Sequence, residues 1–428
     1  MKCSIYNFII PLNELEYVIY NSKTNALAII NDEELNVLKN IEGITNLKLY
    51  ERIIDDFRLG EYIVDSSVNE LNDIKYKLLK SRYSTNSLTL IIAPTMSCNF
   101  RCTYCYEKNH LNNSFMSNKI MKSIIDFVRK KSVSIDNLNV CWYGGEPLLA
   151  FDIIEKLTKE LKKICSERDI FYSSFMVTNG YLLNKSISSK LRELDINSLQ
   201  ITIDGDKKSH NSRRVLANGE GTYETIISNL KENIDVLPNV ILRINLDKDN
   251  IDSQYELIDI IKDFDIENKI FINIAKVENS SGNCLYNRCF TDEEFHNYEM
   301  DFIKKSKGEV VFGRYPKIIS NVCGADCISS FIINYDGGLY KCWSDIGIED
   351  KRVGFLENGS IKLDFNGLYF DYLLYDPTED QECRNCKYLP ICMGGCPRDR
   401  LLNENKKCTF YKYKLDSYIL NLIDSIGI

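Results

Sequence analysis

Three cysteines near residue 100 have the spacing of a metal-binding loop. Cys98, Cys102 and Cys105 stand in the stretch SCNFRCTYCY, which gives the pattern CxxxCxxC. Thiolates bind zinc and iron, and structural centres of both metals normally take four protein ligands. Three cysteines leave one position open, and the nearest histidine, His110, is one of only 3 in the chain. The pattern favours a site whose fourth ligand comes from outside the protein over a zinc knuckle or a chance cluster.

The other cysteines are concentrated near the end of the chain, which holds 16 in all. In a large protein of this kind, many cysteines indicate metal or redox chemistry rather than disulfides. The last quarter contains Cys323, Cys327, Cys342, Cys383, Cys386, Cys392, Cys396 and Cys408. The scattered remainder, which we predict to be buried thiols, is Cys3, Cys141, Cys165, Cys284 and Cys289.

The middle of the chain alternates strand-like and helical segments, which is typical of a parallel α/β sheet. The predicted strands are 88–94, 137–145, 171–180, 198–205, 239–246 and 270–277, separated by helical segments such as 151–167 and 222–235. Ligands of such sheets bind beyond the carboxyl ends of the strands. The cysteine loop follows the first strand, GGEP (144–147) the second, TNG (178–180) the third and DG (204–205) the fourth. We therefore expect these four motifs to share one site.

The first 87 or so residues have a different pattern. They predict a hairpin over 17–30, helices over 32–42, 47–57 and 69–83, and a short strand over 60–64. This pattern is that of a small separate α/β domain.

Composition excludes several classes of partner. The net charge of −8 and the pI near 5.3 argue against binding to nucleic acid or to an anionic membrane. No apolar run is long enough to span a bilayer, and Pro11 interrupts the N-terminal stretch where a signal peptide needs an unbroken apolar segment. We therefore expect a globular, cytoplasmic protein with no nucleic-acid and no membrane partner.

The cysteine loop, with Tyr104 just before its last cysteine, resembles the signature of the radical S-adenosylmethionine (SAM) enzymes. The resemblance extends over residues 89 to about 275. It implies that Cys98, Cys102 and Cys105 hold a catalytic 4Fe-4S cluster whose open iron chelates the amino and carboxylate groups of SAM. It also implies that a 5′-deoxyadenosyl radical abstracts hydrogen from the substrate, and that the fold is a partial (β/α)6 TIM-type barrel.

The same resemblance assigns SAM contacts to residues at the strand ends. GGEP resembles the family's glycine-rich strand end, where Glu146 would accept from the SAM amino group, although the two glycines also suit a plain turn. Arg214, ten residues after Asp204, would meet the SAM carboxylate, since a guanidinium donates two parallel hydrogen bonds; the alternative is a surface arginine. Asn179 would contact the ribose, although Asn-Gly is first of all a turn. The assigned residues are Gly144, Gly145, Glu146, Pro147, Asn179, Thr202 and Arg214.

The C-terminal cysteines resemble the seven-cysteine pattern of SPASM domains at every fixed spacing. The resemblance implies two auxiliary 4Fe-4S clusters, and therefore three clusters in all. One would be held by Cys327, Cys342 and Cys396, with Cys323, which lies outside the pattern, as the fourth ligand. The other would be held by Cys383, Cys386, Cys392 and Cys408.

These resemblances identify the chain as similar to radical SAM/SPASM peptide maturases, such as the sactionine and ranthipeptide thioether synthases. They imply an oxidoreductase that forms a thioether from a cysteine sulfur to a carbon of a precursor peptide, with a flavodoxin- or ferredoxin-type electron donor. We expect a winged-helix-like domain over 1–87 that recognises the leader peptide, a radical SAM domain over 88–305 and a SPASM domain over 306–428. The alternative for 1–87 is a structural extension that covers the barrel.

Three other functions compete with this interpretation. An anaerobic sulfatase maturase, which generates formylglycine, places an aspartate directly after the cysteine equivalent to Cys342 as a proposed base. Here that residue is Trp343, with Asp345 two positions further on. A maturase that forms carbon–carbon crosslinks is a second alternative. A non-enzymatic electron carrier or zinc adaptor explains the cysteines but not GGEP or the three-ligand site.

Overall fold

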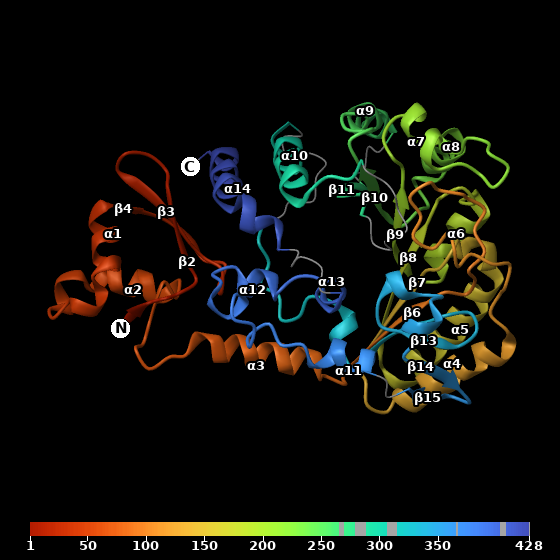
Figure 1. Cartoon of the computed structure of the whole chain (residues 1–428), viewed down its shortest axis with the longest axis horizontal. Helices are drawn as coiled ribbons and strands as arrows, with labels where there is room; N and C mark the ends of the chain where they lie inside the picture. The colour runs from red at the N-terminus through yellow and green to blue at the C-terminus, as the bar shows by residue number, and fades with distance from the viewer. Residues whose placement is uncertain (265–268, 279–287, 306–314, 365–366, 403–407, 428) are drawn as a thin grey trace.

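The computed structural model describes residues 1–264, 269–278, 288–305, 315–364, 367–402 and 408–427. Its main element is a ten-stranded sheet in the order β11-β10-β9-β8-β7-β6-β12-β13-β14-β15. A small N-terminal unit lies at the opposite end of the elongated molecule (Figure 1). All predicted active-site motifs belong to the sheet end.

Six neighbouring strands of this sheet are parallel and follow one another in chain order. They are β6 (Ser87–Ile92), β7 (Asn137–Trp142), β8 (Phe171–Thr178), β9 (Ile196–Thr202), β10 (Asn239–Leu246) and β11 (Ile270–Lys276). The six predicted strands are confirmed. Burial alternates along β10. Val240, Leu242 and Ile244 are fully buried, and the residues between them face the other side of the sheet.

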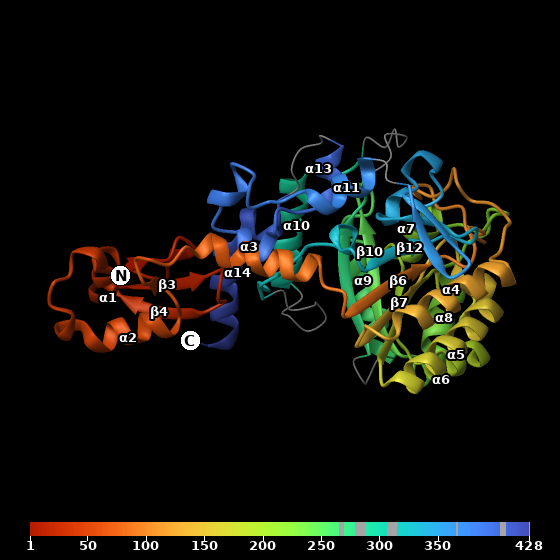
Figure 2. The same cartoon turned by 90° about the horizontal axis from the view of Figure 1, so that it is seen from below.

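Helices cover one face of these strands (Figure 2). They are α4 (Asn118–Lys131), α5 (Phe151–Arg168), α6 (Lys185–Glu193), α7 (Lys207–Arg213), α8 (Tyr223–Asn233) and α9 (Gln254–Phe264). The Ser117 side chain caps the start of α4, and α5 ends at Asp169 in the left-handed conformation. Apolar residues spaced three or four apart, such as Ile154, Leu157 and Leu161 of α5, join the main hydrophobic core.

The sheet continues beyond β6 into the C-terminal part of the chain. β12 (Ser330–Ile333) lies parallel to β6, and the antiparallel strands β13 (Gly338–Tyr340), β14 (Gly354–Glu357) and β15 (Ser360–Leu363) follow. These four strands were not predicted. They carry the central sheet across the expected boundary at residue 306.

The remaining C-terminal helices lie between the sheet and the N-terminal unit (Figures 1 and 2). They are α10 (Asp292–Lys305), α11 (Gly367–Leu374), α12 (Leu389–Cys392), α13 (Pro397–Leu401) and α14 (Phe410–Ile426). No helix in the described ranges is long and apolar enough to cross a membrane.

The N-terminal unit contains a three-stranded antiparallel sheet, β2 (Asn7–Pro11), β3 (Glu16–Asn21) and β4 (Leu27–Asn31). Helices α1 (Asp32–Lys39) and α2 (Glu51–Leu59) follow, β1 (Lys2–Cys3) pairs with β5 (Ile63–Val64), and α3 (Glu70–Arg82) leads to β6. The predicted hairpin and helices are confirmed, whereas β2 was missed. Leu415, Ile419 and Ile423 of α14 pack against apolar side chains of β2 and β3. The two ends of the chain therefore share one hydrophobic cluster.

Candidate functional site

The cysteine loop is held by the backbone that follows β7. Ser97 O accepts a hydrogen bond from the Glu146 N–H at 2.8 Å, and Thr95 O accepts one from the Gly145 N–H at 3.2 Å. A Cβ atom on Gly144, whose φ is +107°, would lie 2.4 Å from Thr95 O, and one on Gly145 would lie 2.4 Å from Ser97 O. Only glycine permits this approach. The glycines of GGEP therefore fit the end of β7 against the cysteine loop.

A cavity of about 510 Å³ opens at the carboxyl ends of the parallel strands. The predicted residues that line it are Cys98, Cys102, Cys105, Gly144, Gly145, Glu146, Asn179, Thr202 and Arg214. Pro147 is buried at the start of the following 3-10 turn and is not part of the lining. The structure therefore brings together motifs that are spread over more than 100 residues of sequence.

Sequence reasoning missed several residues that line the same cavity, among them Glu107, Tyr143, Gln200, Arg243, Asn245, Lys276 and Ser344. Gln200 had a usable signal, because it shares a strand face with the predicted residue Thr202. Gln200 and Thr202 are two residues apart on β9, as are Arg243 and Asn245 on β10, so each pair shares one face of its strand. The alternation that points Thr202 toward the cavity also points Gln200 there.

Glu146 joins the ends of two strands. Its carboxylate accepts hydrogen bonds from the Thr178 hydroxyl at 2.7 Å, from the Asn179 N–H at 2.7 Å and from the Leu148 N–H at 3.0 Å. The side chain is buried, and burial raises the pKa of its carboxyl group against the effect of these bonds. Three donors from the protein thus already engage the oxygens that the resemblance assigns to the SAM amino group.

Asn179 and Thr202 differ in how far their side chains are engaged. The Asn179 amide donates to Asn99 Oδ1 at 2.8 Å, and its oxygen accepts from the Tyr181 N–H at 3.0 Å. The Asn-Gly turn expected here is therefore present, and Asn179 also contacts the cysteine loop through Asn99. Thr202 ends β9, is buried and faces the cavity.

Arg214 lies beside the cysteine loop. Its guanidinium donates to the Tyr104 hydroxyl at 2.8 Å and lies 5.7 Å from the centre of the Phe100 ring. The residue is buried, and its Nε has no hydrogen-bond partner among the described residues. The positive charge of Arg214 lowers the pKa of the Cys102 thiol, against the larger effect of burial. Arg214 thus offers a buried, unused donor next to the three cysteines, which fits the carboxylate of a bound SAM.

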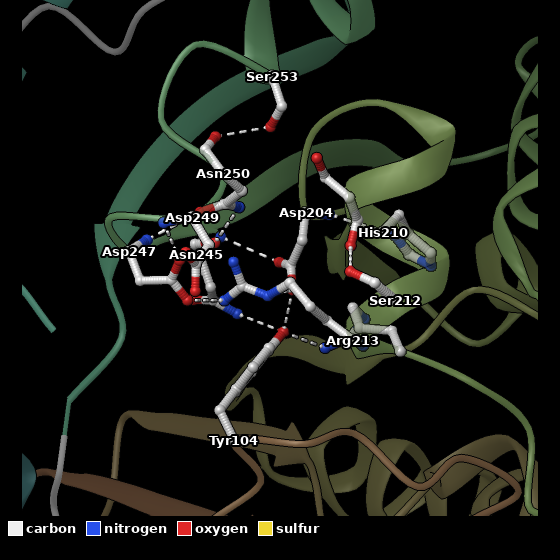
Figure 3. A network of polar contacts seen from close by, with 12 residues as sticks. Tyr104, Asp204, His210, Ser212, Arg213, Asn245, Asp247, Asp249, Asn250 and Ser253 are labelled. Carbon is white, nitrogen blue, oxygen red and sulfur yellow. Dashed lines mark hydrogen bonds and ion pairs between the residues drawn. The ribbon is translucent and has the colours of Figure 1, made fainter. Parts of the chain in front are cut away.

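Tyr104 is the centre of a polar network behind the cysteine loop (Figure 3). Its hydroxyl donates to Asp204 at 2.5 Å and accepts from the Asn245 amide at 3.1 Å. Arg213 lies over the Tyr104 ring at 4.9 Å and pairs with Asp247 at 2.9 Å. The network joins the loop to the ends of β9 and β10.

His210 helps to hold the backbone of Arg214 in place through Thr222. Its Nδ1 accepts from the Asp204 N–H at 3.2 Å, so the proton of the neutral ring is on Nε2, which donates to Thr222 Oγ1 at 2.9 Å. The Thr222 hydroxyl donates in turn to Arg214 O at 2.6 Å. Burial, together with the charges of Arg214 and Arg213, holds the pKa of His210 well below its usual value. The ring therefore acts as a neutral support.

Cys396 interacts electrostatically with two other C-terminal cysteines, Cys323 and Cys342. Burial raises the pKa of Cys323 to about 11, and the charges of Cys396 and Cys327 act in the same direction. Burial likewise raises the pKa of Cys342 to about 12, with a further contribution from Cys396. Cys396 is thus near both Cys323 and Cys342, which agrees with the predicted grouping.

Two other C-terminal cysteines, Cys408 and Cys386, interact with Lys412 of α14. The Lys412 ammonium donates to Cys408 Sγ at 3.3 Å, and the charges of Cys408 and Cys386 help to raise its pKa. The charge of Cys408 also acts on Cys392, and Cys383 and Cys386 share a turn in which Cys383 O accepts from the Cys386 N–H at 3.0 Å.

The remaining cysteines lie apart from these two groups in the sequence. Cys141 and Cys165 are buried as predicted, Cys3 and Cys289 are half-buried, and Cys284 lies outside the described residues. Within those residues, no three His, Cys, Asp or Glu side chains are grouped closely enough to hold one metal ion. The ligands of a 4Fe-4S cluster bind separate iron atoms and lie further apart.

Trp343 and Asp345 have different surroundings. Trp343 lines the cavity and packs edge-on against Tyr143, with ring centres 4.5 Å apart and an interplanar angle of 77°. Asp345 is buried away from the cavity, where it pairs with Arg398 at 3.1 Å and accepts from the Tyr372 hydroxyl at 3.1 Å. The position directly after Cys342 therefore presents an indole, and Asp345 does not replace a carboxylate there.

Known proteins share this fold. Residues 92–279 match the family model described as the radical SAM superfamily. The cysteine-type anaerobic sulfatase-maturating enzyme of Clostridium novyi (strain NT) is 26% identical over 370 residues, which cover 78% of this chain and 96% of that protein.

Two solved structures show how far the similarity in fold extends. Native anSMEcpe with bound AdoMet and Kp18Cys peptide aligns with a TM-score of 0.64 and 20% identity, covering 80% of this chain and 100% of that one. Streptococcus suis SuiB bound to precursor peptide SuiA aligns with a TM-score of 0.54 and 18% identity, covering 95% and 97%. A match to 95% of the chain is too extensive to omit the N-terminal unit.

Proposed function

We propose that this chain, which matches the radical SAM family model over residues 92–279 and is similar to anaerobic sulfatase-maturating enzymes, is a radical SAM/SPASM enzyme that modifies a ribosomally synthesised precursor peptide. The bond that we propose is a thioether between a cysteine sulfur and a carbon atom of that peptide. The protein would then act as an oxidoreductase with a flavodoxin- or ferredoxin-type electron donor.

The cavity residues fit the cofactors of this family. Cys98, Cys102 and Cys105 would hold one 4Fe-4S cluster, and the unused Nε of Arg214 would bind the carboxylate of SAM. When bound, the cluster and SAM supply one-electron cleavage of SAM and removal of a hydrogen atom from a carbon. The protein orients these groups: the network around Tyr104 fixes Arg214, and the glycines of GGEP fix the loop.

We assign the two groups of C-terminal cysteines to auxiliary 4Fe-4S clusters. The first comprises Cys323, Cys327, Cys342 and Cys396, and the second Cys383, Cys386, Cys392 and Cys408. The divisions that go with this proposal are a winged-helix-like unit over 1–87, a (β/α)6 partial barrel over 88–305 and a SPASM domain over 306–428. Proximity of Cys396 to Cys323 and Cys342, and of Cys408 to Cys392, supports the grouping.

The observation that carries the choice of reaction is Trp343. Oxidation of a single Cys or Ser side chain to formylglycine sheds a proton, for which a carboxylate beside the auxiliary site has a clear use. Trp343 cannot accept that proton, and Asp345 is already paired with Arg398. Thioether formation needs no such base, because metal coordination deprotonates a thiol. The alternatives are formylglycine formation, which the 26% identity to a sulfatase maturase favours, and a carbon–carbon crosslink.

The reaction is tested with two peptides and the reconstituted enzyme. We expect a sulfatase-type peptide to give no formylglycine, and a cognate cysteine-bearing peptide to lose two hydrogens together with one thiol that iodoacetamide can alkylate. Mass spectrometry measures both outcomes. An aldehyde on the first peptide would overturn the proposal. Loss of two hydrogens from the second with its thiol still alkylated would indicate a carbon–carbon crosslink.

We further propose that the leader peptide adds as a strand to the free edge of β4. Ser22 N–H donates to Tyr6 O and Leu12 N–H to Glu16 O, so the even-numbered residues of β3 bond toward β2 and the odd-numbered ones toward β4. The N–H groups of Leu27 and Ile29 on β4 then point away from the sheet. The outer edge of β2 is less suitable, because Pro11 lacks an N–H and Lys387 already donates to Asn7 O.

Paired proline substitutions test this edge. Ile29→Pro removes an outward N–H from β4, and Ile9→Pro removes one from the outer edge of β2. We expect Ile29→Pro to weaken binding of the leader to the full-length enzyme and Ile9→Pro to leave it unchanged, with 5′-deoxyadenosine formation retained in both. Equal leader binding by the two variants would assign residues 1–87 a structural role instead.

A further inference from the structure

Two side chains in the cavity have hydrogen-bond donors that the protein does not use. Arg243, on the cavity face of β10, donates its Nε–H to Asn245 Oδ1 at 2.8 Å and forms no ion pair within the described residues. The Tyr143 hydroxyl, just beyond β7, makes no hydrogen bond within those residues and also lines the cavity. A half-buried guanidinium without an ion-pair partner leaves donors available to an anionic ligand.

The side chains of Arg243 and Tyr143 line the same cavity. Burial is the main cause of the raised pKa of Tyr143, and the charged groups that also act on it are Cys105, Arg243 and Cys342. Tyr143 also contacts Trp343, the neighbour of Cys342. Arg243 and Tyr143 thus line the same cavity as the three cysteines that would hold the first cluster, and Tyr143 packs on the residue next to Cys342, which would hold an auxiliary one.

The carboxylate of SAM is better matched by the other arginine of the cavity. Arg214 bonds to Tyr104 within the cysteine loop, and its charge acts on both Cys102 and Cys105. Arg243 also lines the cavity, but its side-chain hydrogen bond goes to Asn245 on β10 and not to the cysteine loop. A ligand bound at an iron held by these cysteines therefore meets Arg214 first. This leaves Arg243 for a second anion.

We propose that Arg243 and Tyr143 bind the side-chain carboxylate of an aspartate or glutamate of the substrate peptide, close to the carbon from which hydrogen is removed. A guanidinium and a phenol hydroxyl supply the donors that a carboxylate prefers. The neighbouring Gln200, which makes no side-chain hydrogen bond within the described residues, can bind the adjacent peptide group. The inference rests on the proposed function, in that the substrate is a peptide.

The experiment uses the full-length reconstituted enzyme loaded with SAM and kept without reductant, so that no turnover occurs. Equilibrium dialysis compares radiolabelled N-acetyl-aspartate N-methylamide with N-acetyl-asparagine N-methylamide. We expect wild type to bind the aspartate probe at least about 10-fold more tightly, because its hydrogen bonds are charge-assisted. Arg243→Gln should abolish this preference, Arg243→Lys should keep part of it, and Tyr143→Phe should reduce it. Arg192→Gln, on the exposed surface of α6, is the matched control and should behave as wild type.

Three results would overturn the inference. They are equal binding of the two probes by wild type, an unchanged preference in Arg243→Gln, and weaker binding of labelled SAM to Arg243→Gln with no effect on the preference. The Arg243→Lys variant shows whether a loss in Arg243→Gln reflects charge or misfolding. Because the measurement needs no turnover, a product that lacks a thioether would overturn the proposed reaction while leaving the probe preference intact.

Discussion

Replacement of Gly145 by alanine is a sharp test of how the active-site loop is held. The added Cβ would lie 2.4 Å from Ser97 O and 2.8 Å from Met96 O, whereas ordinary contact begins at 3.4 Å. Both neighbours are backbone atoms and cannot rotate away. The strand end and the cysteine loop must therefore separate by about 1 Å, which moves the residue directly before Cys98.

This separation should lower both the free energy of unfolding and the rate of SAM cleavage. The hydrogen bond from the Glu146 N–H to Ser97 O, now 2.8 Å, would become too long to count. Its loss costs about 0.5–1.5 kcal/mol, and the overpacking adds about 1–3 kcal/mol. Together these costs are about 1.5–4.5 kcal/mol. At about 2–4 °C for each kcal/mol, the unfolding temperature should fall by roughly 3–18 °C. A 1 Å displacement of a reacting group costs on the order of 100-fold in rate, so SAM cleavage should fall accordingly.

The assays are thermal unfolding of the protein and formation of 5′-deoxyadenosine under dithionite. Gly43→Ala is the matched control, because no heavy atom lies within 4 Å of its added Cβ. We expect that control to stay within about 0.5 kcal/mol of wild type in stability. If Gly145→Ala unfolds at the same temperature and cleaves SAM at the same rate as Gly43→Ala, the close contact between GGEP and the loop does not hold the site.

Three further predictions concern the cysteines and the polar network. Cys102→Ala should abolish 5′-deoxyadenosine formation, because two thiolates cannot hold a cubane with a free iron, and substantial cleavage would contradict the assignment of the loop. Cys392→Ala should lower iron content and peptide product but leave some SAM cleavage, and an unchanged iron content would show that this thiol is not a ligand. His210→Gln addresses pH: since the pKa of His210 is lowered from 6.5 in the folded protein, stability should fall below pH 6.5 by up to about 1.4 kcal/mol per pH unit. Thermal unfolding between pH 7.5 and 5.5 should show a shallower fall for His210→Gln than for His110→Gln, and equal slopes would mean that His210 is protonated in the fold.

The site was accessible from the sequence because its parts follow consecutive parallel strands. Each motif follows a predicted strand, and parallel strands in chain order bring their ends to one edge. Thr202 was named from the resemblance, and alternation along β9 places Gln200 on the same face of the strand. Local pattern and local geometry agree here, so little tertiary information is needed.

Contacts between distant segments had no comparable signal. β12 adds to β6 across more than 200 residues of chain, and α14 packs on β2 and β3 at the other end of the protein. Asp345 illustrates the same point at the level of one residue. It stands two positions after Trp343, but its orientation is set by Arg398 and Tyr372, which only the folded chain brings near. Sequence spacing therefore predicts ligands within one loop better than it predicts partners across loops.

The reaction is decided by the wall of the cavity rather than by the fold. The same fold matches anSMEcpe over 80% of this chain and SuiB over 95%, and a likeness in fold does not by itself identify the reaction. The cavity wall beside Cys342 has no carboxylate directly after this cysteine. It presents the Trp343 indole packed on Tyr143, and the charge of Arg243 acts on Tyr143. Such a wall can exclude water and bind an anion, but it cannot accept a proton from a substrate radical. A substrate cysteine that binds a cluster iron would release its proton to solvent and would need no base here, and the carboxylate that we propose for the substrate would meet Arg243.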